Sequence, residues 1–291
     1  MFTRPFRFER ANCFADASHL LRRYGEDAKV IAGGQSLMPL INFGLAQPQV
    51  VIDISPAAGR DGDLRSVGTT DGYLTVGALV THVQLASDPV AARAQPMLGA
   101  AAALIGNTQV RNRGTLGGSL AHSDPAAELP LVMVALGADY EVSNGIATRS
   151  VPANEFHLDF LTTSLEPDEL IVSARVPTLG PGWGWSFQEV SRRDGDFALV
   201  AAAVLVRTAV GMIVESRVAV GGVCGRPRRL VDVEVELSGA SLEEAAGRVG
   251  AIRGIEPVDD ANASREHRTH LARVLVTRAI EDACQRSAVA A

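Results

Sequence analysis

The segment Arg111–Pro130 concentrates residue types that can bind an anion. It reads Arg-Asn-Arg-Gly-Thr-Leu-Gly-Gly-Ser-Leu-Ala-His-Ser-Asp-Pro-Ala-Ala-Glu-Leu-Pro. Glycines let the backbone turn sharply with no Cβ in the way, so several N–H groups can converge on one anion while flanking hydroxyl groups add donors. The pair Gly117-Gly118, between Thr115 and Ser119, therefore predicts a phosphate-binding turn.

A second glycine pair, Gly33-Gly34, lies earlier in the chain and is followed by Gln35 and Ser36. Two turns of similar design predict one ligand whose two phosphates are held between two loops. A glycine pair alone is more often a plain turn, and a third pair in the range 221–222 shows how unspecific the signal is. The polar side chains beside the first two pairs favour binding. The first loop lacks GxGxxG spacing, which disfavours a Rossmann dinucleotide fold.

Charged residues near the second pair allow more than one role. Arg111 and Arg113 can pair with a diphosphate, or with Asp124 and Glu128 inside the chain. The two carboxylates can form an acid–base couple, but nothing nearby offers a nucleophile or a metal, so acceptance from ligand hydroxyls, such as those of a ribityl chain, is the favoured use. Phe197 is either a core aromatic, the favoured interpretation, or a ring that shields a cofactor face.

Composition excludes several classes of function. The 291 residues include 47% hydrophobic residues and carry a formal net charge of −6. An acidic chain is a poor partner for nucleic acid or an anionic membrane, because proteins bind both of these through clustered basic residues. No apolar run reaches the roughly 18 residues that a membrane helix needs, and no signal peptide is recognisable. We expect a cytoplasmic protein with no membrane span.

The reactive side chains narrow the chemistry further. The three cysteines, Cys13, Cys224 and Cys284, lie far apart, so they predict neither an iron–sulfur cluster nor a zinc site, and we expect inert thiols. The histidines are also scattered. Lys29 is the single lysine, and it precedes a glycine loop rather than following one, which excludes a Walker A motif.

The elements around the two loops follow from hydrophobic periodicity and turn signals. A helix is predicted over 12–24, and strands over 29–32 and 50–54, so the first glycine loop follows a strand. The stretch from Arg111 is expected as a loop lying over a helix at 126–136. Further predictions are hairpins at Asp71-Gly72 and Asn144-Gly145, helices over 82–87 and 97–105, and a strand over 170–176.

The range 178–184 is dense in glycine and proline and is the best candidate linker. Strands are predicted beyond it over 186–190, 198–207 and 212–221, followed by helical segments over 242–249 and 263–286. Strands followed by helices, without strict alternation, indicate an α+β unit.

Taken together, the motifs Ala32–Leu37, Gln109–Ser119 and Asp124–Pro130 resemble the FAD-binding medium subunit of molybdenum hydroxylases, the group of carbon monoxide dehydrogenase and xanthine dehydrogenase. Both glycine motifs match in order and spacing, and similarity covers nearly the whole chain, including Asp168–Ile171 and Ser191–Phe197. The resemblance implies the α+β fold of a two-subdomain FAD-binding domain of the vanillyl-alcohol-oxidase (PCMH) type, plus a small C-terminal α+β domain with a three-stranded antiparallel sheet and helices. The implied bounds are 1–177, with subdomains of about 1–56 and 57–177, and 178–291.

The resemblance also implies positions for the cofactor. Ala32–Ser36 and Thr115–Ser119 correspond to diphosphate-binding loops, Glu128 to an acid that binds the ribityl chain, and Ile171 to a backbone contact with the isoalloxazine. Gln188 stands where xanthine dehydrogenases have a lysine near the flavin, so NAD is not to be assumed as oxidant. The full set of implied FAD contacts is Ala32, Gly33, Gly34, Gln35, Ser36, Leu37, Ile105, Thr115, Leu116, Gly117, Gly118, Ser119, Asp124, Glu128, Ile171 and Gln188.

Similar proteins work in complexes, and the resemblance implies the same here. A molybdopterin-binding large subunit would hydroxylate substrate, and a small subunit with two [2Fe–2S] clusters would relay electrons to FAD, in a dimer of heterotrimers. The chain would pass the electrons to an external acceptor and would not act on substrate alone. Two alternatives stay open: a self-sufficient FAD-dependent oxidoreductase of the same fold superfamily, and a nucleotide-binding assembly module without a redox role.

Overall fold

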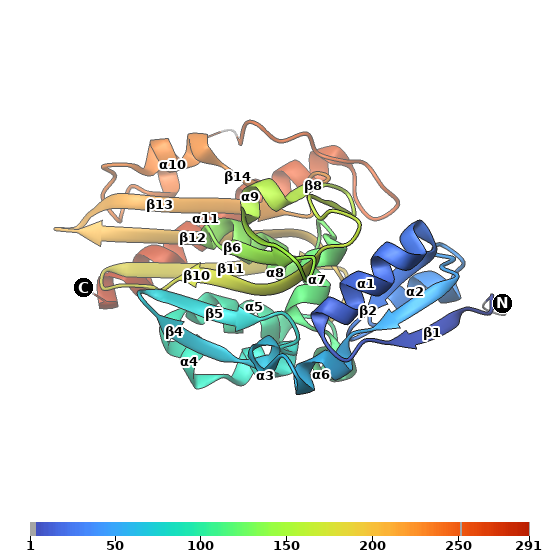
Figure 1. Ribbon diagram of the computed structural model, residues 1–291. Coiled ribbons are helices and arrows are strands. Elements are labelled where there is room, and N and C mark those ends of the chain that lie inside the picture. The colour runs from blue at the N-terminus through green and yellow to red at the C-terminus, as the bar shows by residue number, and fades with distance from the viewer. Residues whose placement is uncertain (1–3, 251, 291) are drawn as a thin grey trace.

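The computed structural model describes residues 4–250 and 252–290. The chain begins with a small parallel sheet in the strand order β1-β3-β2, shown in blue in Figure 1. Helix α1 is capped by Cys13 and ends at Gly25, whose φ of 55° suits a glycine. Strand β2 lies at the edge of this sheet and leads directly into the first glycine loop. The elements are β1 (Arg7–Arg10), α1 (Phe14–Tyr24), β2 (Ala28–Ile31), α2 (Leu37–Asn42) and β3 (Val50–Asp53).

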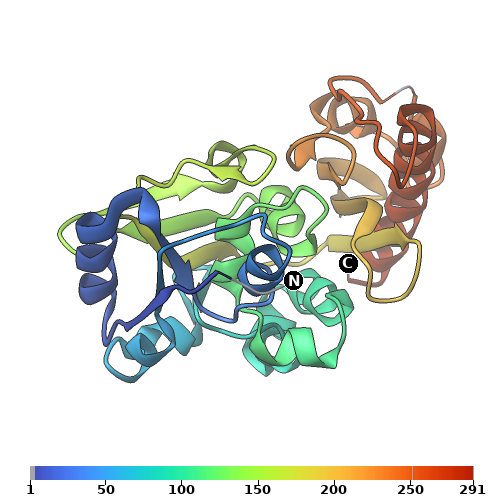
Figure 2. The same cartoon turned by 90° about the vertical axis from the view of Figure 1, so that its right-hand side faces the viewer.

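A five-stranded sheet in the order β4-β5-β10-β6-β7 occupies the middle of the molecule, between the N-terminal elements and the C-terminal sheet (Figures 1 and 2). Its strands are β4 (Val67–Thr70), β5 (Tyr73–Gly77), β10 (Leu170–Pro177), β6 (Asp139–Ser143) and β7 (Thr148–Pro152). The associated helices are α3 (His82–Ser87), α4 (Pro89–Ala94), α5 (Pro96–Leu104), α6 (Thr108–Arg113), α7 (Leu116–His122), α8 (Glu128–Leu136) and α9 (Ala153–Phe156). A short hairpin, β8 (His157–Asp159) and β9 (Thr162–Thr163), follows α9.

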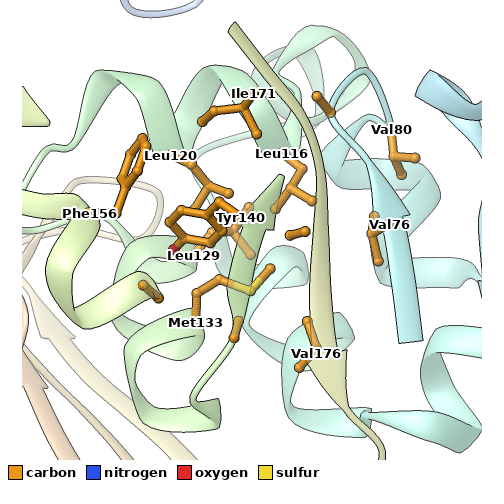
Figure 3. Packing of buried hydrophobic residues seen from close by; sticks show 14 of the residues in the cluster. Val76, Val80, Leu116, Leu120, Leu129, Met133, Tyr140, Phe156, Ile171 and Val176 are labelled. Carbon is orange, nitrogen blue, oxygen red and sulfur yellow. The ribbon is translucent and has the colours of Figure 1, made fainter. Parts of the chain in front are cut away.

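The main core lies between this sheet and helices α7 and α8. Alternate side chains of β5, β6 and β10 point inward, as the period of two in a strand requires. They meet Leu116 and Leu120 of α7 and Leu129 and Met133 of α8, with Tyr140 at the centre (Figure 3). Every residue of α8 is buried, which is expected for a helix that is covered on all sides. The five-stranded sheet covers one side of α8, and the C-terminal sheet packs against another side.

The C-terminal sheet has the order β11-β12-β13-β14 and two distinct faces. Ala201, Ala203 and Leu205 of β12 pack toward the main core, while the even-numbered residues of this strand pack toward α11. Helix α11 has 26 residues, many of them charged, and is the longest described helix. Within the described ranges no helix is long and apolar enough to cross a membrane. The elements are β11 (Trp183–Ser191), β12 (Ala198–Ala209), β13 (Met212–Gly221), β14 (Arg228–Arg229), α10 (Val231–Leu237) and α11 (Arg265–Ala290).

The α+β fold class is confirmed, with three local differences. The stretch from Arg111, expected as a loop, is largely helical, because the side chains of Asn107 and Thr115 cap α6 and α7. The helix expected over 242–249 shrinks to a 3-10 turn, and α10 forms earlier instead. The two-residue β14 adds a fourth strand to the expected three.

Candidate functional site

The first glycine loop presents a row of unpaired backbone donors. The N–H groups of Ala32–Ser36 donate no hydrogen bond to any described residue, because this segment lies between the end of β2 and the start of α2. Gly34 adopts a φ of 74°, which re-aims the chain within the row. The side chain of Gln35 stays local, with its Nε2 donating to the carbonyl oxygen of Gly33 at 3.0 Å. Successive free N–H groups in a turn form a concave anion site, so this loop fits a phosphate.

The two glycine loops lie against each other, as expected from the sequence. A Cβ added to Gly33 would lie 2.1 Å from the carbonyl oxygen of Arg113 and 2.9 Å from the Cα of Gly114. Such distances leave no room for any side chain at Gly33. The Nε of Arg113 also lies 3.4 Å from the carbonyl oxygen of Gly33. The loops are thus in direct backbone contact although they are far apart in the sequence.

The second loop contributes differently from what the sequence suggested. The N–H groups of Leu116 and Gly117 donate to carbonyl oxygens in the segment 78–80 at 2.9 and 2.8 Å. The N–H of Gly118 donates to the hydroxyl of Thr115 at 3.1 Å. The expectation that amides of both loops are free for a phosphate is therefore wrong for the second loop. Within the second glycine pair, Gly118 is exposed and presents a surface without a side chain.

The two arginines have separate positions. The Nη1 of Arg111 donates to the carbonyl oxygens of Ile105 and Gly106 at 3.0 and 2.8 Å, which fixes the turn before α6. Arg113 is exposed at the contact between the loops. The alternative of an ion pair with Asp124 or a neighbouring carboxylate is wrong, since no such pair occurs among residues 4–250 and 252–290. Only Arg113 remains placed to meet a diphosphate.

The third glycine pair joins the C-terminal sheet to the segment that carries the two acids. The N–H of Gly222 donates to the carbonyl oxygen of Pro125 at 2.7 Å, and Gly222 has a φ of 73°. Asp124 folds back on its own turn, with Oδ1 accepting from the N–H of Ala126 at 2.9 Å. This turn places Glu128 at the first position of α8, beneath the C-terminal sheet.

Glu128 is the most deeply buried acid of the predicted set, at 5% exposure. The pKa of Glu128 is raised to about 8, chiefly by burial and to a smaller extent by the negative charges of Glu189 and Asp124, against a lowering contribution from its own backbone N–H. At neutral pH this side chain is protonated, so it can both donate to and accept from a ligand hydroxyl.

Glu189, which the sequence interpretation did not select, lies on the side of β11 that faces the main core. The strand alternates, so Trp183, Trp185 and Phe187 pack against that core, and residue 189 shares their face. Gln188 pairs with Ala202 of the opposite face and lies on the side covered by α11. The side chain of Gln188 therefore points away from the main core and that of Glu189 toward it, and a contact of Gln188 with the flavin stays a prediction.

The remaining predicted cofactor contacts differ in how far their side chains are buried. Ile171 is 5% exposed, with its side chain in the main core beside a β-bulge of β10 (Figure 3). Leu116 is also a core side chain, while Ile105 and Leu37 are half-buried. Of these residues, Ile105 and Leu37 keep partly open side chains, whereas the side chains of Ile171 and Leu116 are buried. Ser119 is half-buried within α7.

A buried polar network holds the end of α7 in place. The Nδ1 of His157 lies 2.8 Å from the hydroxyl of Ser123, and its Nε2 lies 3.1 Å from the hydroxyl of Tyr140. All three side chains are at most 1% exposed. Ser123 has a left-handed φ of 52° and immediately precedes Asp124. Nη1 of Arg226, from the C-terminal domain, donates to the carbonyl oxygen of His157 at 3.0 Å, so the network also spans the domains.

A Tyr140→Phe substitution should lower the free energy of unfolding by about 1 to 3 kcal/mol, because it leaves a buried imidazole nitrogen without its partner. The ring contacts remain, including the edge-on contact with Phe156 at 4.8 Å between centroids. The free energy of unfolding is measured in urea for wild type, for Tyr140→Phe and for the control Tyr73→Phe, which changes a half-buried tyrosine on β5. Equal stability of Tyr140→Phe and wild type would show that the hydroxyl is not needed.

A large cleft opens next to the acid-bearing segment. Its volume is about 1150 Å³, and its walls include Asp124 on one side and the loop carrying Phe197 on the other. Phe197 is 61% exposed, so the interpretation of this ring as a core aromatic is wrong. Gly195 of the same loop packs against Gly106, with its added Cβ 3.2 Å from the Gly106 carbonyl oxygen. The loop thus reaches from the C-terminal sheet to the turn that Arg111 stabilises.

Comparison with known families identifies two consecutive matches. Residues 4–179 match the family described as the FAD binding domain in molybdopterin dehydrogenase. Residues 185–283 match the family described as the CO dehydrogenase flavoprotein C-terminal domain. The first match contains both glycine loops and both acids of the segment 124–128.

Similar proteins of known name cover nearly the full chain. The nicotine 6-hydroxylase medium subunit of Paenarthrobacter nicotinovorans is 40% identical over 285 residues, which is 97% of this chain and 98% of that protein. The carbon monoxide dehydrogenase medium chain of Hydrogenophaga pseudoflava is 32% identical, with 97% and 98% covered. Among solved structures, carbon monoxide dehydrogenase from the same organism, lacking the Mo-pyranopterin moiety of its cofactor, superimposes with a TM-score of 0.92 at 33% identity over 98% of this chain and 99% of that chain. Quinoline 2-oxidoreductase from Pseudomonas putida 86 gives 0.91 at 35% identity, with 99% of each chain covered.

Proposed function

Since the chain belongs to the FAD-binding flavoprotein family of molybdenum hydroxylases, we propose that it is the electron-transfer subunit of such a complex. It binds FAD, which supplies the redox chemistry when bound; the protein supplies position and electrostatics. In this proposal FAD receives electrons from [2Fe–2S] clusters on a partner subunit and passes them to an external acceptor. The chain alone does not act on the organic substrate.

The observation that carries the proposal is the backbone contact of Gly33 with Arg113 and Gly114. This contact joins the loop with the unpaired N–H groups of Ala32–Ser36 to the end of α6, which leads into the second glycine loop. A diphosphate needs many donors within a small space, and this row provides them without desolvating any side chain. Arg113 adds a cation at the same place.

The acids fit the rest of the cofactor. Asp124 and Glu128 follow the second loop directly, so a ligand with its diphosphate between the loops can extend its ribityl chain past α7 toward α8. A protonated Glu128 can satisfy a ribityl hydroxyl without adding a buried charge. We propose that the isoalloxazine lies beyond the ribityl chain, on the α8 side, where it would approach the backbone of Ile171 and the exposed ring of Phe197.

The proposed partners are the subunits that would supply this chain with electrons. A [2Fe–2S] cluster takes four cysteine ligands, and the chain has three cysteines, two of them buried singly. We therefore infer that a [2Fe–2S] small subunit and a molybdopterin-binding large subunit complete a cytoplasmic dimer of heterotrimers. We also retain the domain division at 177–178, with subdomains of about 1–56 and 57–177.

A self-sufficient FAD-dependent oxidoreductase is the second candidate. The observation that favours it is the cleft of about 1150 Å³ beside Asp124, which has room for an organic substrate. Against it, the described residues that line this cleft include no acid–base set with a base held by a third group. Turnover by the single polypeptide would decide for this candidate.

Purification of the native protein from its source tests the proposed function. The expected preparation is yellow, releases one FAD per chain on denaturation, and contains a molybdopterin-binding polypeptide and a [2Fe–2S] polypeptide. Loss of substrate oxidation after removal of the partners, with FAD reduction by dithionite retained, supports an electron-transfer role. A colourless preparation that cannot be reconstituted with FAD would contradict it.

A further inference from the structure

The imidazole of His82 packs against the turn 113–115, which joins α6 to α7. His82 is the first residue of α3. A Cβ added to the buried Gly114 would lie 2.6 Å from Cδ2 and 2.7 Å from Nε2 of this ring. Both distances are well below the roughly 3.5 to 4.0 Å at which carbon atoms pack. The ring therefore occupies the space that a side chain at position 114 would need.

The same glycine touches the first glycine loop. A Cβ on Gly33 would lie 2.9 Å from the Cα of Gly114, so the two backbones are in contact. The φ of Gly114 is −56°, which any residue can adopt, so backbone conformation does not require a glycine here. The next neighbour of an added Cβ, the carbonyl oxygen of Val110, lies 3.0 Å away, a distance that a small shift relieves. The main obstacle to a side chain at position 114 is thus the ring of His82.

Backbone hydrogen bonds fix the start of α3 against this turn. The N–H of His82 donates to the carbonyl oxygen of Gly114 at 3.0 Å. The N–H groups of Leu116 and Gly117 donate to carbonyl oxygens in the segment 78–80 at 2.9 and 2.8 Å. Helices α3 and α6 consequently lie side by side (Figure 1). These bonds hold the backbone of His82 in one place, so its ring is held against Gly114.

The ring acts here through its shape rather than through a charge. His82 is 5% exposed, and its Nδ1 is buried with no hydrogen-bond partner among the described residues. Burial also lowers the pKa of His82 to about 4, so the ring is neutral at pH 7. A buried polar atom without a partner lowers protein stability, and an apolar side chain would avoid this cost. Stability alone therefore does not account for an imidazole at this place.

We propose that His82 is a positioning residue of the cofactor site, whose ring fills the space beside Gly114 and so holds the turn 113–115 against the first glycine loop. This inference rests on the proposed function, because it takes the contact of Gly33 with this turn as part of the site where FAD binds. His82 itself does not touch the cofactor. Its ring is complementary in volume to the missing side chain at position 114, so the two positions respond together to substitution.

Substitutions at the two positions are expected to be non-additive. Gly114→Ala forces a methyl group against the ring, which moves the turn away from Gly33 and should weaken FAD binding about tenfold. His82→Ala removes the support of the turn and should weaken binding by a similar factor. In the double variant the methyl group enters the vacated space, so FAD should bind as tightly as to His82→Ala or more tightly. Independent effects would instead multiply to about 100-fold.

The dissociation constant of FAD in wild type, the two single variants and the double variant tests this inference. The native protein, with the partners that copurify, is deflavinated and titrated with FAD at pH 7, and quenching of flavin fluorescence is recorded. The urea midpoint of the FAD-free protein is measured in parallel, because a merely structural role would lower this midpoint without changing the affinity of the folded protein. Two controls should bind FAD like wild type: Val83→Ala, at the next and exposed position of α3, and Gly59→Ala, where an added Cβ meets nothing within 4 Å.

An equal loss of affinity from Gly114→Ala in both backgrounds would overturn the inference, as would wild-type affinity in His82→Ala; both results leave the proposed function intact. If Gly114→Ala alone does not fold, FAD binding should return when His82→Ala is added, and failure to return would overturn the inference. His82→Asn, which also shortens the side chain, replaces His82→Ala if the latter does not fold. Absence of FAD binding by wild type would instead contradict the proposed function.

Discussion

A Gly33→Ala variant is expected to bind FAD about 10- to 100-fold more weakly than wild type. The added Cβ would lie 2.1 Å from the carbonyl oxygen of Arg113, and the neighbour is backbone, which cannot rotate away. Overpacking of this kind costs about 1 to 3 kcal/mol, and each 1.4 kcal/mol corresponds to about tenfold in affinity. The first loop must move off Arg113 and Gly114, which displaces the row of N–H groups in Ala32–Ser36.

Gly68→Ala is the matched control for this prediction. A Cβ at Gly68 would meet nothing within 4 Å, and its φ is not in the left-handed region. FAD content after purification and the dissociation constant are measured for both variants, together with the urea midpoint to separate lost binding from lost folding. Wild-type affinity in Gly33→Ala would show that contact between the two loops is not required for the cofactor.

Acidification from pH 6.5 to pH 4 is expected to cost the folded protein about 3 kcal/mol for each of two buried histidines. Burial lowers the pKa of His82 to about 4, and burial with the nearby Arg226 lowers the pKa of His157 to about 4. In the unfolded chain these groups titrate near 6.5. Their contribution to stability is therefore complete above pH 6.5, and it is lost as pH falls toward 4, where the unfolded state binds more protons.

Urea unfolding across this pH range, followed for wild type and single variants, measures the two contributions. His157→Gln should show a shallower loss of stability than wild type, because glutamine takes up no proton while it can still bond to the hydroxyl of Ser123 or Tyr140. His19→Gln, at an exposed position of α1, should follow the wild-type curve. A wild-type slope in His157→Gln would mean that this imidazole does not resist protonation.

The glycine loops could be recognised from the sequence because each combines three local signals: a glycine pair, polar side chains beside it, and a defined place relative to a strand or an apolar helix. Their contact could be expected only from the assumption of one shared ligand. The structure confirms the contact, through Gly33 and Gly114. The resemblance to the flavoprotein family, based on the same motifs, is confirmed as well.

The short helices could not be predicted from composition. α6 and α7 have 6 and 7 residues, below the length at which a helix is stable without tertiary contacts. They form because Asn107 and Thr115 cap them and because the N–H groups of α7 bond to the segment 78–80. The same bonds occupy the amides that the sequence interpretation had assigned to the phosphate. Tertiary hydrogen bonding is invisible in a local motif.

The faces on which Gln188 and Glu189 lie follow from the geometry of the strand. Side chains alternate along β11, so a shift of one residue moves a side chain to the opposite face of the sheet. Assignment by position in a family motif does not respect this alternation. The series Trp183, Trp185 and Phe187 already indicates which face is apolar, and Glu189 continues it. The exposure of Phe197 likewise could not be predicted from a local pattern, because tertiary packing decides which side chains are buried.

A structure of the native complex with FAD bound tests the central claim most directly. The account predicts the diphosphate between the two glycine loops, within hydrogen-bonding distance of N–H groups in Ala32–Ser36, with a ribityl hydroxyl on the carboxyl group of Glu128. A diphosphate bound elsewhere, with those N–H groups left to water, would contradict it.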